Sequence, residues 1–291
     1  MSQTIGFIGI GVMGKSMAGH LLKAGYDVHI YTRTKDKAID LIDKGAVWES
    51  SVKDIAQKCD VVMTMVGYPS DVEDVYFSPD YGILNFHKNN AILIDFTTST
   101  PSLAEKIYNT AKKTGANSID APVSGGDIGA KNAKLTIMCG GEQTTFDKCM
   151  PMLEHLGTNI VLQGGAGAGQ HTKMSNQIAI AASMLGMCES IIYAEKAGLD
   201  PERVLQSISA GSAGSWSLSN YSPRIFAGDF EPGFYIKHFI KDMKIALDEA
   251  EKMNLKLPGL ELTKSLYDTL SNEGLSEKGT QALYKWYEKQ L

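Results

Sequence analysis

Gly9-Ile10-Gly11-Val12-Met13-Gly14 is the stretch of this 291-residue chain that decides the fold of its first half. Residues 4–8 before it are apolar and predict a strand, residues 15–24 after it have helical periodicity, and a second strand is expected over 27–31. In this setting the first glycine allows a tight turn, the second lets a pyrophosphate approach the backbone, and the third lets helix and strand pack closely. We therefore predict a dinucleotide-binding turn; the alternative is a plain glycine-rich turn.

Short apolar runs and helical segments alternate up to about residue 165, which is typical of a sheet covered by helices on both faces. The remaining strands are expected over 61–66, 91–94, 117–119, 135–139 and 160–162. Several of these runs are apolar at consecutive positions, as in buried parallel strands. Residues 1–164 are thus predicted to form an α/β domain with a Rossmann-type, doubly wound and mainly parallel sheet.

Strand signals stop after Gly169, and the rest of the chain has the pattern of helices. Residues 170–197 are apolar nearly all the way round, which predicts a long buried interdomain helix that ends at Gly198. Asp200-Pro201-Glu202 supplies an N-cap, a first-turn proline and an acidic first turn for the next helix. Further helices are expected over 215–226, 237–253, 260–271 and 277–288. Residues 165–291 are therefore predicted to form an all-α domain.

The composition excludes several classes of protein. With 43% hydrophobic and 21% charged residues the chain can bury an ordinary core, and its net charge of −5 gives no general attraction for nucleic acid or a membrane surface. The longest apolar run, 178–188, is well short of the roughly 20 residues of a membrane span. The four cysteines and six histidines show no disulfide or metal-ligand spacing, so we expect reduced thiols and no metal. Because residues 1–8 lack signal-peptide character, we expect a cytoplasmic protein.

The end of the second predicted strand bears on which dinucleotide binds. An NAD-selective site carries an acidic residue about 20 positions after the fingerprint, where it binds the ribose 2′-hydroxyl. This chain has Thr32-Arg33-Thr34 there instead. Because the Arg33 guanidinium suits a 2′-phosphate and an adenine ring, we expect NADP to be preferred over NAD. Asp36 lies close by, and the alternative is that Arg33 is a solvated surface charge.

A second glycine-rich cluster, Asp120-Ala121-Pro122-Val123-Ser124-Gly125-Gly126, directly follows a predicted strand. Its small residues would expose backbone N–H groups and the Ser124 hydroxyl at the carboxyl edge of the sheet. Such a set of donors suits a carboxylate. The alternative is a strand-to-helix turn in which glycine serves only the geometry.

A third cluster, Gly164-Gly165-Ala166-Gly167-Ala168-Gly169, leads into Lys173, and Asn176 and Gln177 follow on nearly the same helix face. Lysine and amide groups near the start of an apolar buried helix are costly unless they are paired or used. A partly desolvated lysine beside a cationic nicotinamide ring could act as a general acid/base. The alternative for Lys173 is a solvated or capping charge in the first helical turn.

Taken together, these motifs resemble the β-hydroxyacid dehydrogenase family, which includes 3-hydroxyisobutyrate dehydrogenase, tartronate semialdehyde reductase and, more distantly, 6-phosphogluconate dehydrogenase. The resemblance runs through the whole chain in order. Its motifs are the fingerprint, Asp95-Phe96-Thr97-Thr98 with Pro101, the loop 120–126, Gly167-x-Gly169-x-x-x-Lys173-x-x-Asn176, and Lys241-Asp242. The resemblance implies a Rossmann domain and a helical domain with the subunit contacts of a homodimer or homotetramer.

The resemblance also implies a role for each candidate residue. Lys173 would be the catalytic acid/base, and Asn176 or Gln177 would bind the substrate. The implied contacts of the substrate carboxylate are Ser124, Gly125 and Gly126. The implied cofactor contacts, besides Gly9, Ile10, Gly11, Val12, Met13 and Gly14, are Thr32, Arg33, Thr34, Met65, Val66, Gly67, Thr98 and Lys241.

Three segments depart from the family pattern. Many members have two consecutive asparagines after the lysine, whereas this chain has Asn176-Gln177, so the amide that reaches the substrate stays open. The usual Gly-Thr-Leu is Ala133-Lys134-Leu135 here, and the Asn-Arg-Thr of NADP-preferring members is Thr32-Arg33-Thr34. None of these changes removes a group that the expected chemistry needs.

The expected activity is hydride transfer between NADP(H) and a short 3-hydroxy acid or semialdehyde, with Lys173 protonating the developing alkoxide. An imine reductase is one alternative, but these enzymes generally place Asp or Tyr where Lys173 stands. A decarboxylating 6-phosphogluconate enzyme would need a longer helical domain. A non-catalytic NADP-binding scaffold of the same fold is the alternative from another class of protein.

Overall fold

The computed structural model describes residues 3–289 and divides the chain into two compact units, 1–173 and 174–291. Unit 1 holds a nine-stranded sheet in the order β3-β2-β1-β4-β5-β6-β8-β7, with β9 paired to β8. Its strands are β1 Thr4–Ile8, β2 Asp27–Tyr31, β3 Val47–Trp48, β4 Val61–Thr64, β5 Ile92–Asp95, β6 Asn117–Asp120, β7 Val123–Ser124, β8 Leu135–Gly141 and β9 Gly157–Gly164. The first six strands in this order, β3, β2, β1, β4, β5 and β6, are parallel to one another. Strand β8 runs antiparallel to β6 and β7.

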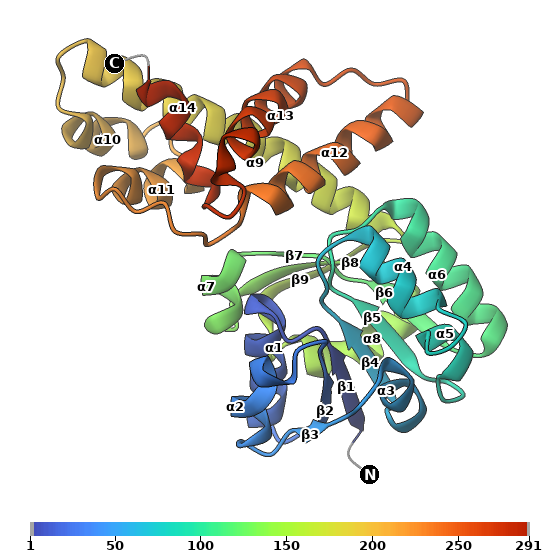
Figure 1. The fold of residues 1–291 in the computed structure, drawn as a ribbon. Helices are drawn as coiled ribbons and strands as arrows, with labels where there is room; N and C mark the ends of the chain where they lie inside the picture. The colour runs from blue at the N-terminus through green and yellow to red at the C-terminus, as the bar shows by residue number, and fades with distance from the viewer. Residues whose placement is uncertain (1–2, 290–291) are drawn as a thin grey trace. The chain divides into compact units, whose positions relative to one another are not determined.

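Helices cover both faces of this sheet, as the consecutive apolar residues of β4 and β5 predict. One core cluster joins the strands to α1 Val12–Lys23, α2 Ile39–Ile42 and α8 Gln143–Leu153. A second cluster joins them to α3 Val52–Lys58, α4 Pro69–Phe77, α5 Ile83–Phe86 and α6 Pro101–Thr114. Figure 1 shows α1 and α2 on one side of the sheet and α4 to α6 on the other. The predicted doubly wound sheet is confirmed.

Unit 2 is helical, as predicted. The long helix α9, Ala168–Lys196, begins in unit 1 and continues into unit 2, where one buried core cluster unites it with the later helices. These are α10 Pro201–Ser209, α11 Trp216–Phe226, α12 Ile236–Lys252, α13 Pro258–Leu270 and α14 Tyr284–Glu288. The Asp200 carboxylate accepts hydrogen bonds from the backbone N–H groups of Glu202 and Arg203, so the expected N-cap of α10 is present.

Two expectations for the helices need correction. The prediction that the long helix is buried is only partly right, because one stripe of α9, which includes Ser175, Ala179, Ala182 and Gly186, is exposed. The single helix expected over 277–288 is wrong, since a 3₁₀ turn, Thr280–Leu283, precedes the short α14. Among residues 3–289, α9 is the one helix whose length and composition would let it cross a membrane. An 18-residue stretch of it has a mean hydropathy of 1.4, a value that core helices of soluble proteins also reach.

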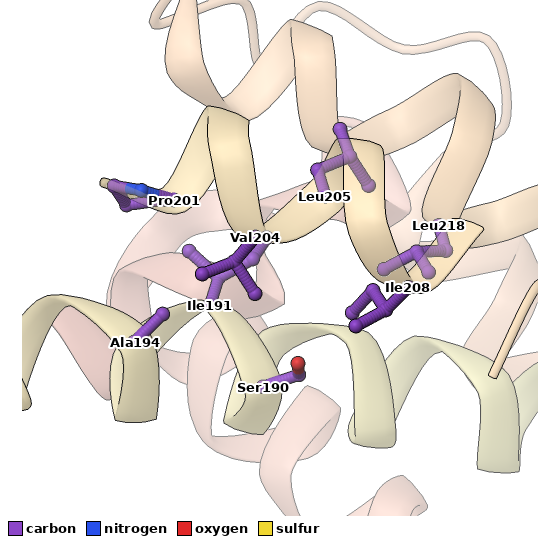
Figure 2. Close-up of a pocket in the computed structure, with 8 residues that line it drawn as sticks. All are labelled: Ser190, Ile191, Ala194, Pro201, Val204, Leu205, Ile208 and Leu218. Carbon is purple, nitrogen blue, oxygen red and sulfur yellow. The ribbon is translucent and has the colours of Figure 1, made fainter. Parts of the chain in front are cut away.

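Unit 2 also contains a small gap in its packing, shown in Figure 2. The gap has a volume of about 10 Å³ and lies among apolar side chains of α9, α10 and α11, with the Ser190 hydroxyl as its polar contribution. A volume of this size holds at most about one water molecule. It is therefore a packing defect beneath α10 and has no room for a substrate.

Candidate functional site

The glycine turn after β1 has the geometry that the fingerprint predicts. Gly9 has a φ of +99°, and a Cβ there would lie 2.2 Å from the Met65 carbonyl oxygen. A Cβ on Gly14 would lie 2.0 Å from the Gly9 carbonyl oxygen, so α1 packs directly on the turn. A Cβ on Gly11 would meet nothing within 4 Å. The open space at Gly11, at the N-terminus of α1, is the cradle that a pyrophosphate would fill, so the residues present fit a dinucleotide.

The segment after β2 leaves Arg33 free to meet a ligand. Its side chain is 86% exposed, and its Nη1 lies 3.7 Å from the Asp71 Oδ1 of α4. An ion pair of this length at the surface contributes little to stability. The guanidinium is therefore open to solvent, just after the end of the strand where a ribose 2′-substituent would lie.

A buried hydrogen-bond network links the loops that follow β4 and β5. The Thr64 hydroxyl donates to the Asp95 Oδ1 at 2.7 Å, and the backbone N–H of Thr97 donates to the same oxygen at 3.1 Å. The Val66 N–H donates to the Thr97 hydroxyl oxygen at 3.0 Å. Because Thr64, Asp95 and Thr97 are buried, the network holds the segment 65–67 against the segment that leads to Thr98.

The start of α9 is anchored by the carboxylate of Asp120 at the end of β6. Its Oδ1 accepts from the Gly167 N–H at 2.8 Å and its Oδ2 from the Gln170 N–H at 2.9 Å. These are helix N-terminal donors that would otherwise lack partners. Burial raises the pKa of Asp120 to about 6, and the two N–H donors oppose that rise.

The loop predicted to bind a carboxylate lies between β7 and α7, Gly126–Lys131. Ser124 pairs with Thr136 of β8, which fixes the loop to the sheet. Gly125 and Gly126 have φ values of +127° and +62°, conformations that favour glycine. The structure thus explains the glycine pair by backbone geometry, and it leaves Ser124 half-buried and Gly125 exposed at the loop.

Ala133, where the family has glycine, stands just beyond this loop. It has a φ of +53° and is one of three non-glycine residues with positive φ among those described. A left-handed alanine is strained by about 1 kcal/mol or more. Alanine in place of glycine at position 133 should therefore cost some stability.

Lys173 lies in α9, one turn after Gln170, and is 6% exposed. Burial of a lysine is costly unless the group is paired or has a chemical role. The two predicted amides, Asn176 and Gln177, follow Lys173 in the sequence and belong to a separate set of polar contacts within unit 2. In unit 2 the Asn176 Nδ2 donates to the Gln177 Oε1 at 2.8 Å, and the Gln177 Nε2 donates to the Asp242 Oδ2 at 2.7 Å.

Lys241 of α12 completes this polar chain in unit 2, because its Nζ lies 3.1 Å from the Asp242 Oδ1. Asp242 is 1% exposed, so the ion pair is nearly dry. We refer to the linked side chains of Asn176, Gln177, Asp242 and Lys241 as the Asn176–Lys241 chain. Lys241 was predicted as a cofactor contact, and the structure adds that its ammonium group pairs with a buried carboxylate.

Sequence reasoning gave no role to Gln170 or to the Asp120 and Asp242 carboxylates. A signal for Gln170 was present, because it stands three residues before Lys173 and shares its helix face. Both carboxylates accept hydrogen bonds from groups far away in the sequence, and single-sequence patterns do not reveal such bonds. All four cysteines are free and buried, and no cluster of metal ligands is found among residues 3–289. Burial raises the pKa values of Cys59 and Cys149 to about 12.

Two family models match most of the chain. Residues 4–165 match the NAD binding domain of 6-phosphogluconate dehydrogenase, and residues 167–287 match the family described as NAD-binding of NADP-dependent 3-hydroxyisobutyrate dehydrogenase. Among solved structures, a 3-hydroxyisobutyrate dehydrogenase of Mycobacterium tuberculosis with L-serine is similar at a TM-score of 0.90 and 27% identity. That likeness covers 98% of this chain and 99% of that chain.

Relatives match over nearly the whole chain. The uncharacterized oxidoreductase YkwC of Bacillus subtilis is 59% identical, covering 99% of this chain and 100% of that protein. The probable 3-hydroxyisobutyrate dehydrogenase-like 1 of Arabidopsis thaliana is 50% identical, covering 96% and 83%. The 2-hydroxy-3-oxopropionate reductase of Escherichia coli is 35% identical, covering 96% and 95%, and the NAD-dependent L-serine dehydrogenase of Pseudomonas aeruginosa is 32% identical, covering 98% of both. The chain therefore belongs to the 3-hydroxyisobutyrate dehydrogenase family of β-hydroxyacid dehydrogenases, with a nucleotide-binding domain of the 6-phosphogluconate dehydrogenase type, and is an NAD(P)-dependent oxidoreductase.

Proposed function

We propose that this oxidoreductase interconverts a short 3-hydroxy acid and the corresponding semialdehyde or oxo acid, with NADP(H) as the preferred cofactor and Lys173 as the general acid/base. The observation that carries the proposal is the burial of Lys173 on the helix that Asp120 anchors to the carboxyl edge of the sheet. A buried ionisable group is suited to transferring a proton to a reacting oxygen. The 2-hydroxy-3-oxopropionate reductase relative supports this class of substrate.

The bound nicotinamide would supply or accept the hydride. Ser124 and the N–H groups of Gly125 and Gly126 bind and orient the substrate carboxylate, which fixes the carbonyl carbon relative to the cofactor. Lys173 donates a proton from its Nζ to the carbonyl oxygen as negative charge develops there, and takes it back in the reverse direction. The burial of Lys173 excludes water from that proton transfer.

The polar contacts in unit 2 support different roles for the two predicted amides. Gln177 is 1% exposed and donates to Asp242, so its orientation is fixed by the protein. Asn176 is half-buried and contacts Gln177 through one amide hydrogen. We therefore assign substrate binding to Asn176 and the positioning of Asn176 to Gln177.

Turnover by Lys173→Ala tests the proposed function most directly. NADPH oxidation is followed at 340 nm with glyoxylate, succinic semialdehyde, methylmalonate semialdehyde and tartronate semialdehyde. The variant is expected to lose about 10²- to 10⁴-fold in kcat, the usual contribution of a general acid/base, with an unchanged Kd for NADPH. Lys113→Ala, which removes an exposed lysine from α6, is the control and should retain full activity. Normal turnover by Lys173→Ala would refute the assignment.

The cofactor preference has its own test. Arg33 is exposed and carries no strong ion pair, which supports a role in binding a 2′-phosphate. We expect kcat/KM to be higher with NADPH than with NADH, and Arg33→Gln to raise KM for NADPH about tenfold while KM for NADH changes little. A wild-type preference for NADH would overturn this part of the proposal and align the enzyme with its NAD-dependent L-serine dehydrogenase relative.

A further inference from the structure

Gln170 spans the backbone on both sides of Thr98. Its Nε2 donates to the Thr97 carbonyl oxygen at 2.8 Å, and its Oε1 accepts from the Ser99 N–H at 2.9 Å. Thr97, Ser99 and Gln170 are each at most 1% exposed, whereas Thr98 between them is half-buried. We refer to these two side-chain hydrogen bonds as the Gln170 bridge. Like a neighbouring β-strand, the bridge supplies one donor and one acceptor to the loop backbone. Of residues 97, 98 and 99, Thr98 is the one that is not buried.

The backbone of Gln170 is fixed as firmly as its side chain. Its N–H donates to the Asp120 Oδ2, and the next residue towards the N-terminus is packed without room for a side chain. A Cβ on Gly169 would lie 2.3 Å from the Met138 carbonyl oxygen, and a Cβ on Gly140 would lie 2.7 Å from the Gly169 nitrogen. The first turn of α9 therefore cannot slide along the sheet edge. The backbone of Lys173, one turn later in the same helix, is therefore fixed as well.

We propose that Gln170 is a positioning residue that couples the loop presenting Thr98 to the turn of α9 that carries Lys173. The proposal rests on the proposed function for its statement about Lys173. The physical reason is that Gln170 ties the loop to the helix, because its carboxamide bonds the loop and its backbone N–H bonds Asp120. Loss of the bridge leaves a buried carbonyl and a buried N–H without partners, so the loop must move towards water or another donor.

A role in stability alone makes a different prediction from positioning. If Gln170 only stabilised the fold, its replacement would lower the melting temperature and leave dinucleotide affinity and turnover of the folded enzyme unchanged. Positioning predicts losses in the folded enzyme itself, because a shift of about 1 Å in a reacting group costs about 10²-fold in rate. The two possibilities are separated by measuring all three quantities on the same variants.

Gln170→Leu tests the bridge in the full-length protein. We expect the Kd for NADPH, measured by fluorescence titration, to rise about tenfold, and kcat to fall about 100-fold with whichever aldehyde the wild type reduces. The control is Ile30→Val, a buried change in β2 that lowers the melting temperature without touching the loop. A Gln170→Leu enzyme with wild-type Kd and kcat at a lowered melting temperature would overturn the proposal.

Gln170→Glu adds a readout that a structural role would not move. A protonated glutamic acid can donate to the Thr97 oxygen and accept from the Ser99 N–H, and so restores the bridge, whereas a carboxylate cannot donate. The ratio of variant to wild-type kcat should therefore fall as pH rises. The charged groups on the elements around the bridge are Asp95 of β5, Glu105 of α6, Asp120 of β6 and Lys173 of α9, and they are common to both enzymes, so the wild-type pH profile is the reference for them. A ratio independent of pH would contradict the bridge.

The outcomes distinguish failure of this inference from failure of the proposed function. If the wild type binds NADPH but reduces none of the four aldehydes, the proposed function fails, and the Kd of Gln170→Leu still tests the bridge on the Thr98 loop. If the wild type turns over and Gln170→Leu behaves like Ile30→Val, the bridge fails and the proposed function stands.

Discussion

Gln170 and Gln177 are the same residue type, two helical turns apart on α9, and both are buried, yet they bind different kinds of partner. Gln170 belongs to unit 1 and bonds to two backbone groups of the loop that carries Thr98. Gln177 belongs to unit 2 and bonds to the side chains of Asn176 and Asp242. A backbone partner is present whatever the loop sequence is, whereas a side-chain partner can be lost by one substitution. The Gln170 bridge therefore does not depend on the side chains of the loop, whereas the Asn176–Lys241 chain depends on the identity of each of its side chains.

The buried carboxylates differ in the same way. Asp120 binds neutral N–H groups, whereas Asp242 lies beside the ammonium group of Lys241 and accepts from the Gln177 amide. A carboxylate held by neutral donors remains sensitive to burial, which is why the pKa of Asp120 rises. Substitutions at the two sites should therefore have different consequences for stability and for its pH dependence.

The largest effect is expected for Asp242→Ala, which breaks the Asn176–Lys241 chain at its centre. Removal of one partner from a buried ion pair takes the Asp242 charge away from Lys241 and the acceptor away from the Gln177 amide hydrogen, at a cost of about 4 kcal/mol in the free energy of unfolding. Urea denaturation measures this loss. Asp248→Ala on the same helix removes an exposed i,i+4 pair with Lys244 and should cost less than about 1 kcal/mol. Equal losses for the two variants would show that the buried chain adds nothing.

Asp120→Asn should change how the free energy of unfolding depends on pH. The folded pKa of Asp120, about 6, lies above the usual 3.8, so its contribution to stability is fully present below pH 3.8 and is lost as pH rises through 6. The wild type should therefore lose up to about 3 kcal/mol relative to Asp120→Asn between pH 4 and pH 7. Urea denaturation of both proteins at each pH measures the difference. A constant difference would mean that Asp120 is not protonated in this range.

Gly169→Ala tests how tightly the first turn of α9 is packed. Its Cβ would collide with the Met138 and Asp120 carbonyl oxygens, and both are backbone atoms that cannot rotate away. We expect a loss of about 2 kcal/mol in thermal or urea unfolding. Gly186→Ala, in the exposed stripe of the same helix, meets nothing within 4 Å and should instead stabilise by up to about 1 kcal/mol. If both changes stabilised, the close contact at Gly169 would be excluded.

The smallest effect is expected for Gln177→Asn, which restores the two consecutive asparagines of many family members. The amide is one methylene shorter and should lose its bond to Asp242, at a cost of about 1 kcal/mol in stability. If Gln177 positions Asn176 as proposed, KM for the substrate should rise severalfold while the Kd for NADPH stays constant. Asn176→Ala should raise KM more than Gln177→Asn does. The reverse order would transfer the substrate contact to Gln177.

The sequence predicted the helices and strands better than the side-chain hydrogen bonds that connect them. β1 and β2 have the bounds that the apolar runs indicate, because each strand is bounded by turn residues. β3 and β7 were missed, since two-residue strands carry no periodicity. Lys173 and Ser124 stand in recognisable motifs, and their roles stay predictions. The hydrogen bonds of Asp120 to Gln170 and of Asp242 to Gln177 could not be predicted, because the partners lie 50 and 65 residues apart and only the folded chain brings them together.

The buried thiols offer a way to follow the two units separately. Cys59, Cys139 and Cys149 lie in unit 1 and Cys188 lies in unit 2, all buried and with pKa values raised by burial. A thiol-specific reagent reacts with the thiolate, so each cysteine should stay unlabelled until its surroundings open. Mass spectrometry of the labelled peptides then measures the rate at which each unit opens, separately for the two units. The molecule thus carries internal reporters that would reveal whether a change at Asp120 or at Asp242 loosens one half of the chain before the other.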